Sequence, residues 1–202
     1  MNTQMSMREI MEMMDENPDT WAHLFPEKEV LKKARTGWKQ RGLRMKNTRK
    51  ATRSLITLKG VYLYERTCYV PKDEETRQRL MAEGNTTFYP MDIKLGVDRL
   101  PFKMSPGAML KCAEVAVSTE TFQQAEDMLC GPYNVQAGNA TIRAVTNYIS
   151  RIVWPLNREG QSNELARDPK HGPAILRQNL KNMLLDGRWD VVKESLYAEL
   201  LK

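Results

Sequence analysis

The sequence has little of what metal sites and disulfide frameworks require. It contains three cysteines and two histidines in 202 residues. Cys68, Cys112 and Cys130 form an odd set without a CxxC pair, which indicates reduced, mostly buried thiols of a cytoplasmic protein. Even with His23 and His171, the suitably spaced ligands are too few for zinc, so we expect no metal and no cofactor.

Long apolar runs and an export signal are also missing. No stretch approaches the ~18 to 20 apolar residues that span a bilayer, so we expect no membrane partner. The first residues, MNTQMSMREIMEMMDENPD, contain no apolar signal core and too many acids for a transit peptide. These absences favour a cytoplasmic location.

Acidic residues are outnumbered, and the imbalance is local. The chain has 31 Lys and Arg against 25 Asp and Glu, a net charge of +6, with 41% hydrophobic residues, as in a folded soluble protein. The segment LKKARTGWKQRGLRMKNTRKATR, residues 31–53, contains no acid. Its bases are Lys32, Lys33, Arg35, Lys39, Arg41, Arg44, Lys46, Arg49, Lys50 and Arg53.

Two interpretations of this basic segment stay open. Gly37, Gly42 and the polar run KNTRK argue against one continuous helix. The basic segment is either a solvated linker or an arm that follows nucleic-acid phosphates, and the absence of acids favours the arm. Trp38 either stacks on a base or anchors the segment to the protein body, and we expect the anchor.

The N-terminal half is predicted to combine helices with one β-hairpin. Residues 5–15 carry Met7, Ile10, Met11 and Met14 at helical spacing, which indicates a small packing helix or, alternatively, a Met-rich partner surface. PEKEVLKKARTGWKQ, residues 26–40, predicts a second helix that begins at Pro26, with acids early and lysines later. RSLITLKGVYLYERTCYV is β-branched and aromatic, which predicts a hairpin over 54–70. A loop or short exposed helix and an irregular, proline-rich wrap follow it.

The C-terminal half is predicted to be helical. Ser105 precedes a proline and caps one helix, and Thr121 caps a second over 122–130. A third helix spans 139–153, with apolar residues on one side and polar residues on the other. The polar set is Asn139, Arg143, Thr146, Asn147, Ser150 and Arg151. After a polar linker, two helices hinged at Asp186–Gly187 end the chain.

The expected fold is therefore α+β, mainly α. Four segments are predicted: N-terminal helices with the basic arm over 1–53, the hairpin and irregular wrap over 54–104, a helix-turn-helix region over 105–154, and a linker with a helical hairpin over 155–202.

Four motifs occur in a family-like order. TLKGVYLYERTCYV contains Gly60, Tyr62, Arg66 and Tyr69, YPMDIKLGV contains Pro90, Asp92, Leu95 and Gly96, and TETFQQA contains Thr121, Phe122 and Ala125. The fourth is YNVQAGNATIRAVTNYI, the helix-turn-helix segment. Over roughly residues 53–153 this order resembles the N-terminal, DNA-binding half of prokaryotic insertion-sequence transposases of the DDE type. Only Cys68 stands where many relatives have paired zinc ligands. Gln136 replaces the usual Ser or Thr before the last helix, which leaves Asn134 or Asn139 as its cap.

The resemblance implies a downstream ribonuclease-H-like domain in which three carboxylates hold two metal ions. The residues after Pro155 are predicted helical and too few for such a mixed domain. The available acids, Asp168, Asp186, Asp190, Glu194 and Glu199, fall at helix caps or on solvated faces. We expect no catalytic residue and no strand-transfer chemistry in this chain alone.

The resulting hypothesis is a sequence-specific protein that binds double-stranded DNA. Helix 139–153 would enter the major groove and read bases through Asn139, Thr141 and Arg143, while Asn147 and Arg151 would meet phosphates. Most of the affinity would come from the ten bases of residues 32–53. The protein would associate with the nucleoid when DNA-bound.

Two further partner hypotheses remain. The chain is alternatively a transposase-derived adaptor or inhibitor whose basic arm contacts an acidic protein or an RNA. The C-terminal helices carry an apolar stripe, Val192, Leu196, Tyr197 and Leu200, which suggests a homodimer suited to inverted-repeat DNA ends.

Overall fold

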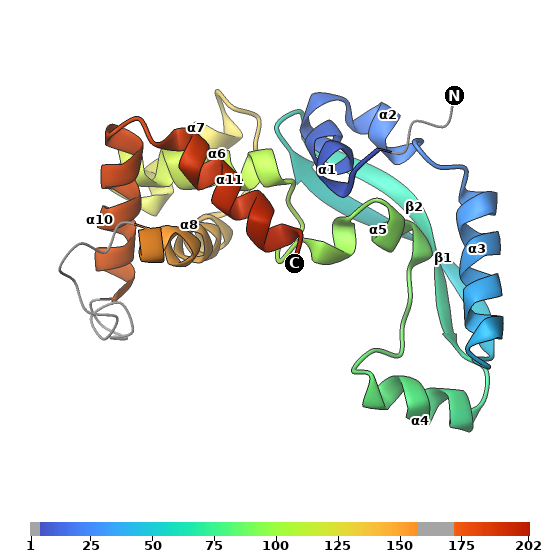
Figure 1. Ribbon diagram of the computed structural model, residues 1–202. Coiled ribbons are helices and arrows are strands. Elements are labelled where there is room, and N and C mark those ends of the chain that lie inside the picture. The colour runs from blue at the N-terminus through green and yellow to red at the C-terminus, as the bar shows by residue number, and fades with distance from the viewer. Residues whose placement is uncertain (1–4, 157–171) are drawn as a thin grey trace. The chain divides into compact units, whose positions relative to one another are not determined.

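The computed structural model describes residues 5–156 and 172–202 of the chain (Figure 1). The expected polar linker after Pro155, with Asp168 and His171, lies largely outside the described residues. The fold is α+β and mainly α, with a two-stranded antiparallel hairpin. The chain divides into two compact units: residues 1–55 with 62–101, and residues 56–61 with 102–202. No described helix has the length and apolar character needed to cross a membrane.

The first unit begins with two short helices. α1 (Met7–Glu16) starts with a capping box in which the Ser6 hydroxyl accepts from the Glu9 backbone N–H and the Glu9 carboxylate accepts from the Ser6 backbone N–H. Its buried residues are Ile10, Met11 and Met14. The predicted packing helix is confirmed, so these side chains are not a partner surface. α2 (Pro18–Ala22) buries Trp21 against Tyr62 and Tyr64 of the hairpin.

The hairpin is longer than predicted. β1 (Met45–Thr57) and β2 (Gly60–Pro71) flank the turn Leu58–Lys59, and Gly60 has a positive φ of 107°, which favours glycine. The prediction placed the start at residue 54. Residues 45–53, the first part of β1, were missed because they are mostly exposed. They therefore lack the apolar alternation that marks a half-buried strand.

The helix α3 (Glu27–Gln40) confirms the helix predicted over 26–40, and the basic segment 31–53 is this helix followed by β1 rather than one continuous helix. α3 continues through Gly37, since one glycine costs a helix only about 1 kcal/mol. It ends before Gly42, whose φ is +69°. α3 runs alongside the outer part of the hairpin (Figure 1). The Trp38 ring lies 4.9 Å from that of Tyr69, so the predicted anchoring role of Trp38 is confirmed.

The rest of the first unit connects back to the hairpin. The predicted loop or short helix is α4 (Glu74–Ala82), capped by Asp73. The irregular wrap contains two short helical pieces, α5 (Pro90–Lys94) and the 3-10 helix η1 (Val97–Arg99). Phe88 pairs with Tyr69 through two backbone hydrogen bonds of 2.9 Å. This pairing holds the segment before α5 against β2.

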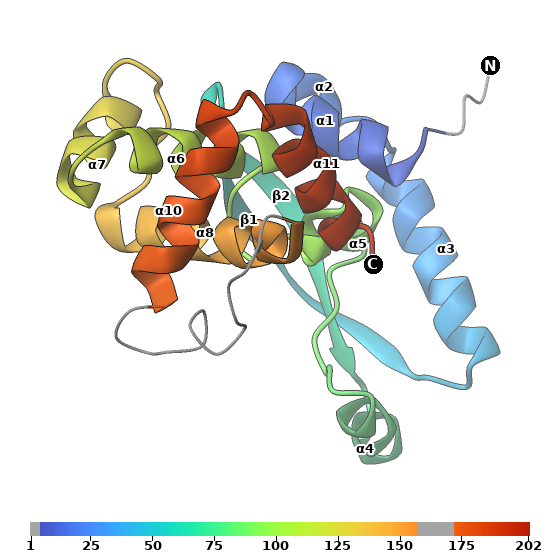
Figure 2. The ribbon, with the colours of Figure 1, turned by 60° about the vertical axis from the view of Figure 1, so that its left-hand side comes forward.

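The second unit is a helical bundle that includes the hairpin tip. Its elements are α6 (Pro106–Ser118), α7 (Phe122–Cys130), α8 (Asn139–Val153), η2 (Trp154–Leu156), α10 (Gly172–Leu185) and α11 (Trp189–Leu200). α8 packs against α6, α7, α10 and α11 (Figure 2). The tip is held where the Ile56 backbone exchanges hydrogen bonds with Lys103 and Ser105. The predicted Ser105 and Thr121 caps are both present.

Candidate nucleic-acid interface

A strip of bases runs along one face of α3. Lys28, Lys32, Arg35 and Lys39 are all exposed and occur at i, i+4, i+7 and i+11, which places them in one line on the helix. Arg35 is oriented by the hairpin, because its guanidinium donates to the Tyr69 hydroxyl at 2.8 Å. The sequence prediction missed Lys28, which precedes the acid-free segment but joins the strip through helical spacing.

The strip ends in a basic hollow of 580 Å³ at the junction of α3 and β1. Four bases line it: Arg35, Lys39, Arg44 and Lys72. No acid is among its described lining residues. Lys72 comes from beyond β2 and reaches the hollow because its backbone N–H donates to the Arg44 carbonyl at 2.8 Å. The arrangement suits an anionic group such as a phosphate.

The other predicted basic residues differ in whether an acidic side chain lies beside them. Lys33, Lys46 and Arg49 are exposed and have no acidic partner in the part of the chain that the structure describes. Three others form surface pairs: Arg41 with Glu83 at 2.5 Å, Lys50 with Glu65 at 3.4 Å and Arg44 with Asp73 at 3.9 Å. Their basic side chains are at least half exposed, so each pair contributes at most ~1 kcal/mol and leaves the base available to a phosphate.

Arg53 is the exception, because its side chain is largely buried and already paired with an acid. Its guanidinium donates to the buried Asp92 carboxylate at 2.7 Å. Arg66 donates to the same oxygen, and the Tyr64 hydroxyl donates to the other at 2.8 Å. Burial, and then the charge of Asp92, raise the pKa of Tyr64 above its ordinary value. This cluster fixes α5 to the hairpin and has no part in the exposed basic surface.

The motif residues behind the transposase resemblance are mainly structural here. Arg66 and Asp92 belong to the buried cluster. Gly96 has φ +75° and lies against α1, where an added Cβ would come within 2.7 Å of the Met7 sulfur. A Cβ on Gly60 would meet Asn134 at 3.0 Å. These positions therefore report on packing and not on a binding surface.

The second predicted surface lies on α8. Asn139, Arg143 and Arg151 are exposed, and Thr141 and Asn147 are half-buried. Thr146 and Ser150, expected on the polar side, are instead buried because α8 is covered by helices on several sides. The surviving strip of Asn139, Arg143, Asn147 and Arg151 keeps the i, i+4 spacing of one face.

The start of α8 differs from the prediction of an Asn134 or Asn139 cap. Gly138 is the cap residue and supplies no side-chain bond. Instead, the Glu126 carboxylate of α7 accepts from the Asn139 backbone N–H at 2.9 Å. Asn134 adopts a left-handed conformation and donates to the Lys59 carbonyl. A carboxylate at the helix N-terminus is stabilising, but it places negative charge beside Asn139.

The connection between α7 and α8 spans residues 131–138. It is longer than the ~3 to 4 residues typical of a DNA-binding helix-turn-helix. Arg143 stands over the Phe122 ring of α7, 5.1 Å from its centroid. This contact holds the guanidinium near the start of α7.

The proposed dimer stripe is not available at the surface. Val192, Leu196, Tyr197 and Leu200 are at most 4% exposed within the chain itself. α11 packs these residues against α6, α8 and α10. The pattern that suggested a homodimer is therefore the inner face of α11, so this stripe does not support the predicted dimer.

Metal and thiol chemistry find little support in the described residues. Among residues 5–156 and 172–202, no three His, Cys, Asp or Glu side chains are placed to hold a metal ion. Cys68, Cys112 and Cys130 are free. Burial raises the pKa of the Cys112 thiol to about 12, so it stays protonated and unreactive at neutral pH.

Comparisons with protein-family models, with curated proteins and with solved structures gave no match to this chain. The transposase resemblance therefore rests on the sequence motifs alone.

Proposed function

We propose that this protein binds double-stranded DNA and that its basic surface on α3 and β1 holds the phosphate backbone. The observation that carries the proposal is the hollow lined by Arg35, Lys39, Arg44 and Lys72 at the end of the α3 strip. Bases in one line on a rigid helix can follow a phosphate backbone, and each phosphate they neutralise releases counterions.

The α8 strip supplies sequence readout in this proposal. Asn139 pairs with adenine and Arg143 with guanine, while Asn147 and Arg151 contact phosphates. The strip has only two bases and stands beside Glu126, so it adds discrimination more than affinity. By its resemblance, the protein corresponds to the DNA-binding half of a DDE transposase and recognises element-end DNA.

The test is binding to random-sequence duplex DNA, single-stranded DNA and RNA across a salt series. The proposal predicts preference for the duplex and affinity that falls steeply with salt, by a slope of about −0.9 for each phosphate neutralised. Weak binding to all three, or a preference for RNA, would contradict it. A site selected from random duplexes then gives the ligand for testing readout by α8.

A further inference from the structure

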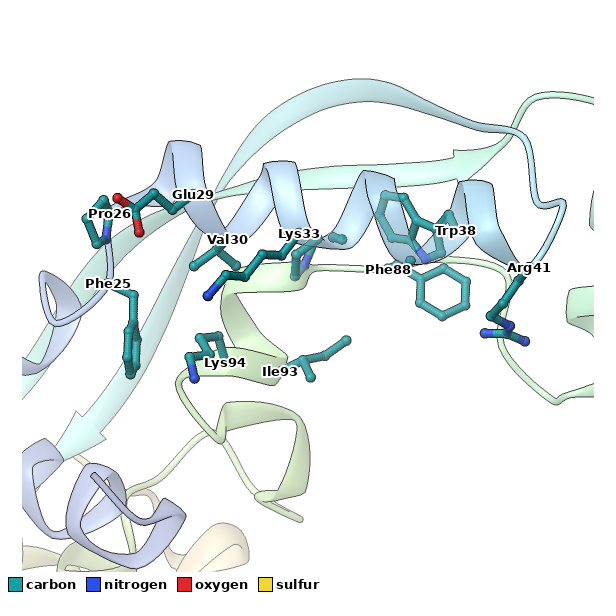
Figure 3. A pocket seen from close by; sticks show the side chains of 13 residues that line it. Phe25, Pro26, Glu29, Val30, Lys33, Trp38, Arg41, Phe88, Ile93 and Lys94 are labelled. Carbon is teal, nitrogen blue, oxygen red and sulfur yellow. The ribbon is translucent and has the colours of Figure 1, made fainter. Parts of the chain in front are cut away.

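A groove of 520 Å³ runs along the side of α3 away from the basic strip. Val30, Ala34 and Trp38 form one wall, and Phe88, Pro90 and Ile93 form the other. Figure 3 shows Val30 and Lys33 of α3 pointing toward Ile93 and Lys94 of α5. The groove lies wholly within the first unit.

The apolar walls of this groove are only partly covered. A surface helix normally buries its apolar stripe, yet the described part of the chain buries no residue of α3. Val30, Ala34 and Trp38 recur at i, i+4 and i+8 and face the groove together. Ile93 is 49% exposed on the opposite wall. Val30, Ala34 and Trp38 are half-buried, so together with the exposed Ile93 they leave apolar surface that a partner can cover.

The length of the groove and the charge at its rim indicate what kind of ligand fits it. From Val30 to Arg41 the α3 wall extends about 16 Å, the length of three helical turns. At the rim, Lys33 and Lys94 outnumber Glu29, and Arg41 is paired with Glu83. Lys94 is placed 4.4 Å from the centroid of the Phe25 ring. A short helix with an apolar stripe and acidic flanks complements both properties.

A nucleobase fits the same groove less well. The described lining residues include no side-chain hydroxyl or amide that could read a base edge. The Trp38 ring already contacts the rings of Tyr69 and Phe88, at 4.9 and 6.1 Å. Stacking platforms for bases need an accessible aromatic face, whereas these walls offer mainly aliphatic groups and ring edges.

We propose that the α3–α5 groove binds an amphipathic helix of a partner protein, with the partner's apolar stripe between Val30 and Ile93 and its acidic flank against Lys33 and Lys94. This surface is separate from the basic hollow, so the protein can hold DNA and a protein partner through two faces of the same helix.

The test uses a fluorescein-labelled helical peptide of about 14 residues, the length of the α3 wall plus one turn. Leucines occupy i, i+4, i+7 and i+11, and glutamates flank them. Anisotropy is expected to show a Kd of roughly 10–100 µM, typical of a short helix in a groove. Ile93→Glu weakens binding at least about tenfold, and Lys94→Glu about three- to tenfold. Both positions are exposed, so circular dichroism should show an unchanged fold.

Matched controls separate this proposal from DNA binding. Lys72→Glu makes the same charge change in the basic hollow, so it lowers duplex affinity and leaves peptide affinity unchanged, whereas Lys94→Glu does the reverse. A control peptide with lysines in place of the glutamates binds at least about tenfold more weakly. The proposal is overturned if the acidic peptide fails to bind at about 1 mM, if Ile93→Glu has no effect, or if single-stranded DNA displaces the peptide.

Discussion

The helices α3 and α8 have a similar amphipathic pattern but differ in how much of it is buried. Both are amphipathic, of similar length, and carry bases on their polar side. α8 buries six of its residues under four neighbouring helices. α3 buries none and is held by Trp38, Arg35 and Glu27 against one side of the hairpin. Amphipathicity alone therefore does not tell whether a helix is buried in the core; that depends on which elements pack against its apolar face.

The largest expected difference between the two helices is in stability. Ile149 of α8 is fully buried, so Ile149→Ala should lower the free energy of unfolding by about 2–5 kcal/mol. Val30 on α3 is only half-buried, and Val30→Ala should cost less than about 1 kcal/mol. Urea unfolding of both variants measures the contrast. Equal losses would mean that α3 is as much a core helix as α8.

The second prediction concerns the buried ion cluster of Asp92, Arg53 and Arg66 in the first unit. Asp92→Asn keeps a partner for Tyr64 but leaves Arg53 and Arg66 without a counter-charge. We expect a loss of about 2–4 kcal/mol, less than for a fully buried pair because both guanidiniums keep some solvent contact. Urea unfolding again gives the measurement. An unchanged midpoint would show that the cluster does not hold α5 to the hairpin.

The sequence predicted the elements whose local pattern determines them. The bounds of α8 agree with the expected 139–153, because its apolar spacing is regular. The start of β1 could not be predicted, since it depends on tertiary contacts that override weak local signals. Lys72 joins the hollow only through the hairpin register, and Glu126 reaches α8 only through the packing of α7.

A third prediction contrasts how the two helices meet DNA. Arg143→Ala should reduce discrimination between a selected site and random duplex by about 1–3 kcal/mol. Lys39→Ala should instead weaken binding to all duplexes alike and reduce the salt slope by about 1. Competition titrations at fixed salt distinguish the two effects. If Arg143→Ala also weakens all sequences equally, α8 contacts phosphates and does not read bases.

The smallest expected effect is that of Glu126→Gln, which should lower stability but raise the affinity for duplex DNA. Glu126→Gln removes a charge from the N-terminus of α8 and should lower stability by about 0.5–1 kcal/mol. The same change removes a negative charge beside Asn139 and should tighten duplex binding by up to about threefold. Thermal unfolding and anisotropy provide the two readouts. Unchanged DNA binding by this variant would place α8 away from the DNA.

The salt dependence of duplex binding by Lys39→Glu/Lys72→Glu tests the central claim most directly. Its control is Lys103→Glu/Lys181→Glu, which makes the same charge change at exposed positions of the second unit. If the basic hollow holds the phosphate backbone, the first variant makes the negative slope of log K against log salt shallower by about 2. The control retains most of the wild-type slope. Equal slopes for the two variants would show that net charge alone drives binding and would contradict the assignment of the hollow.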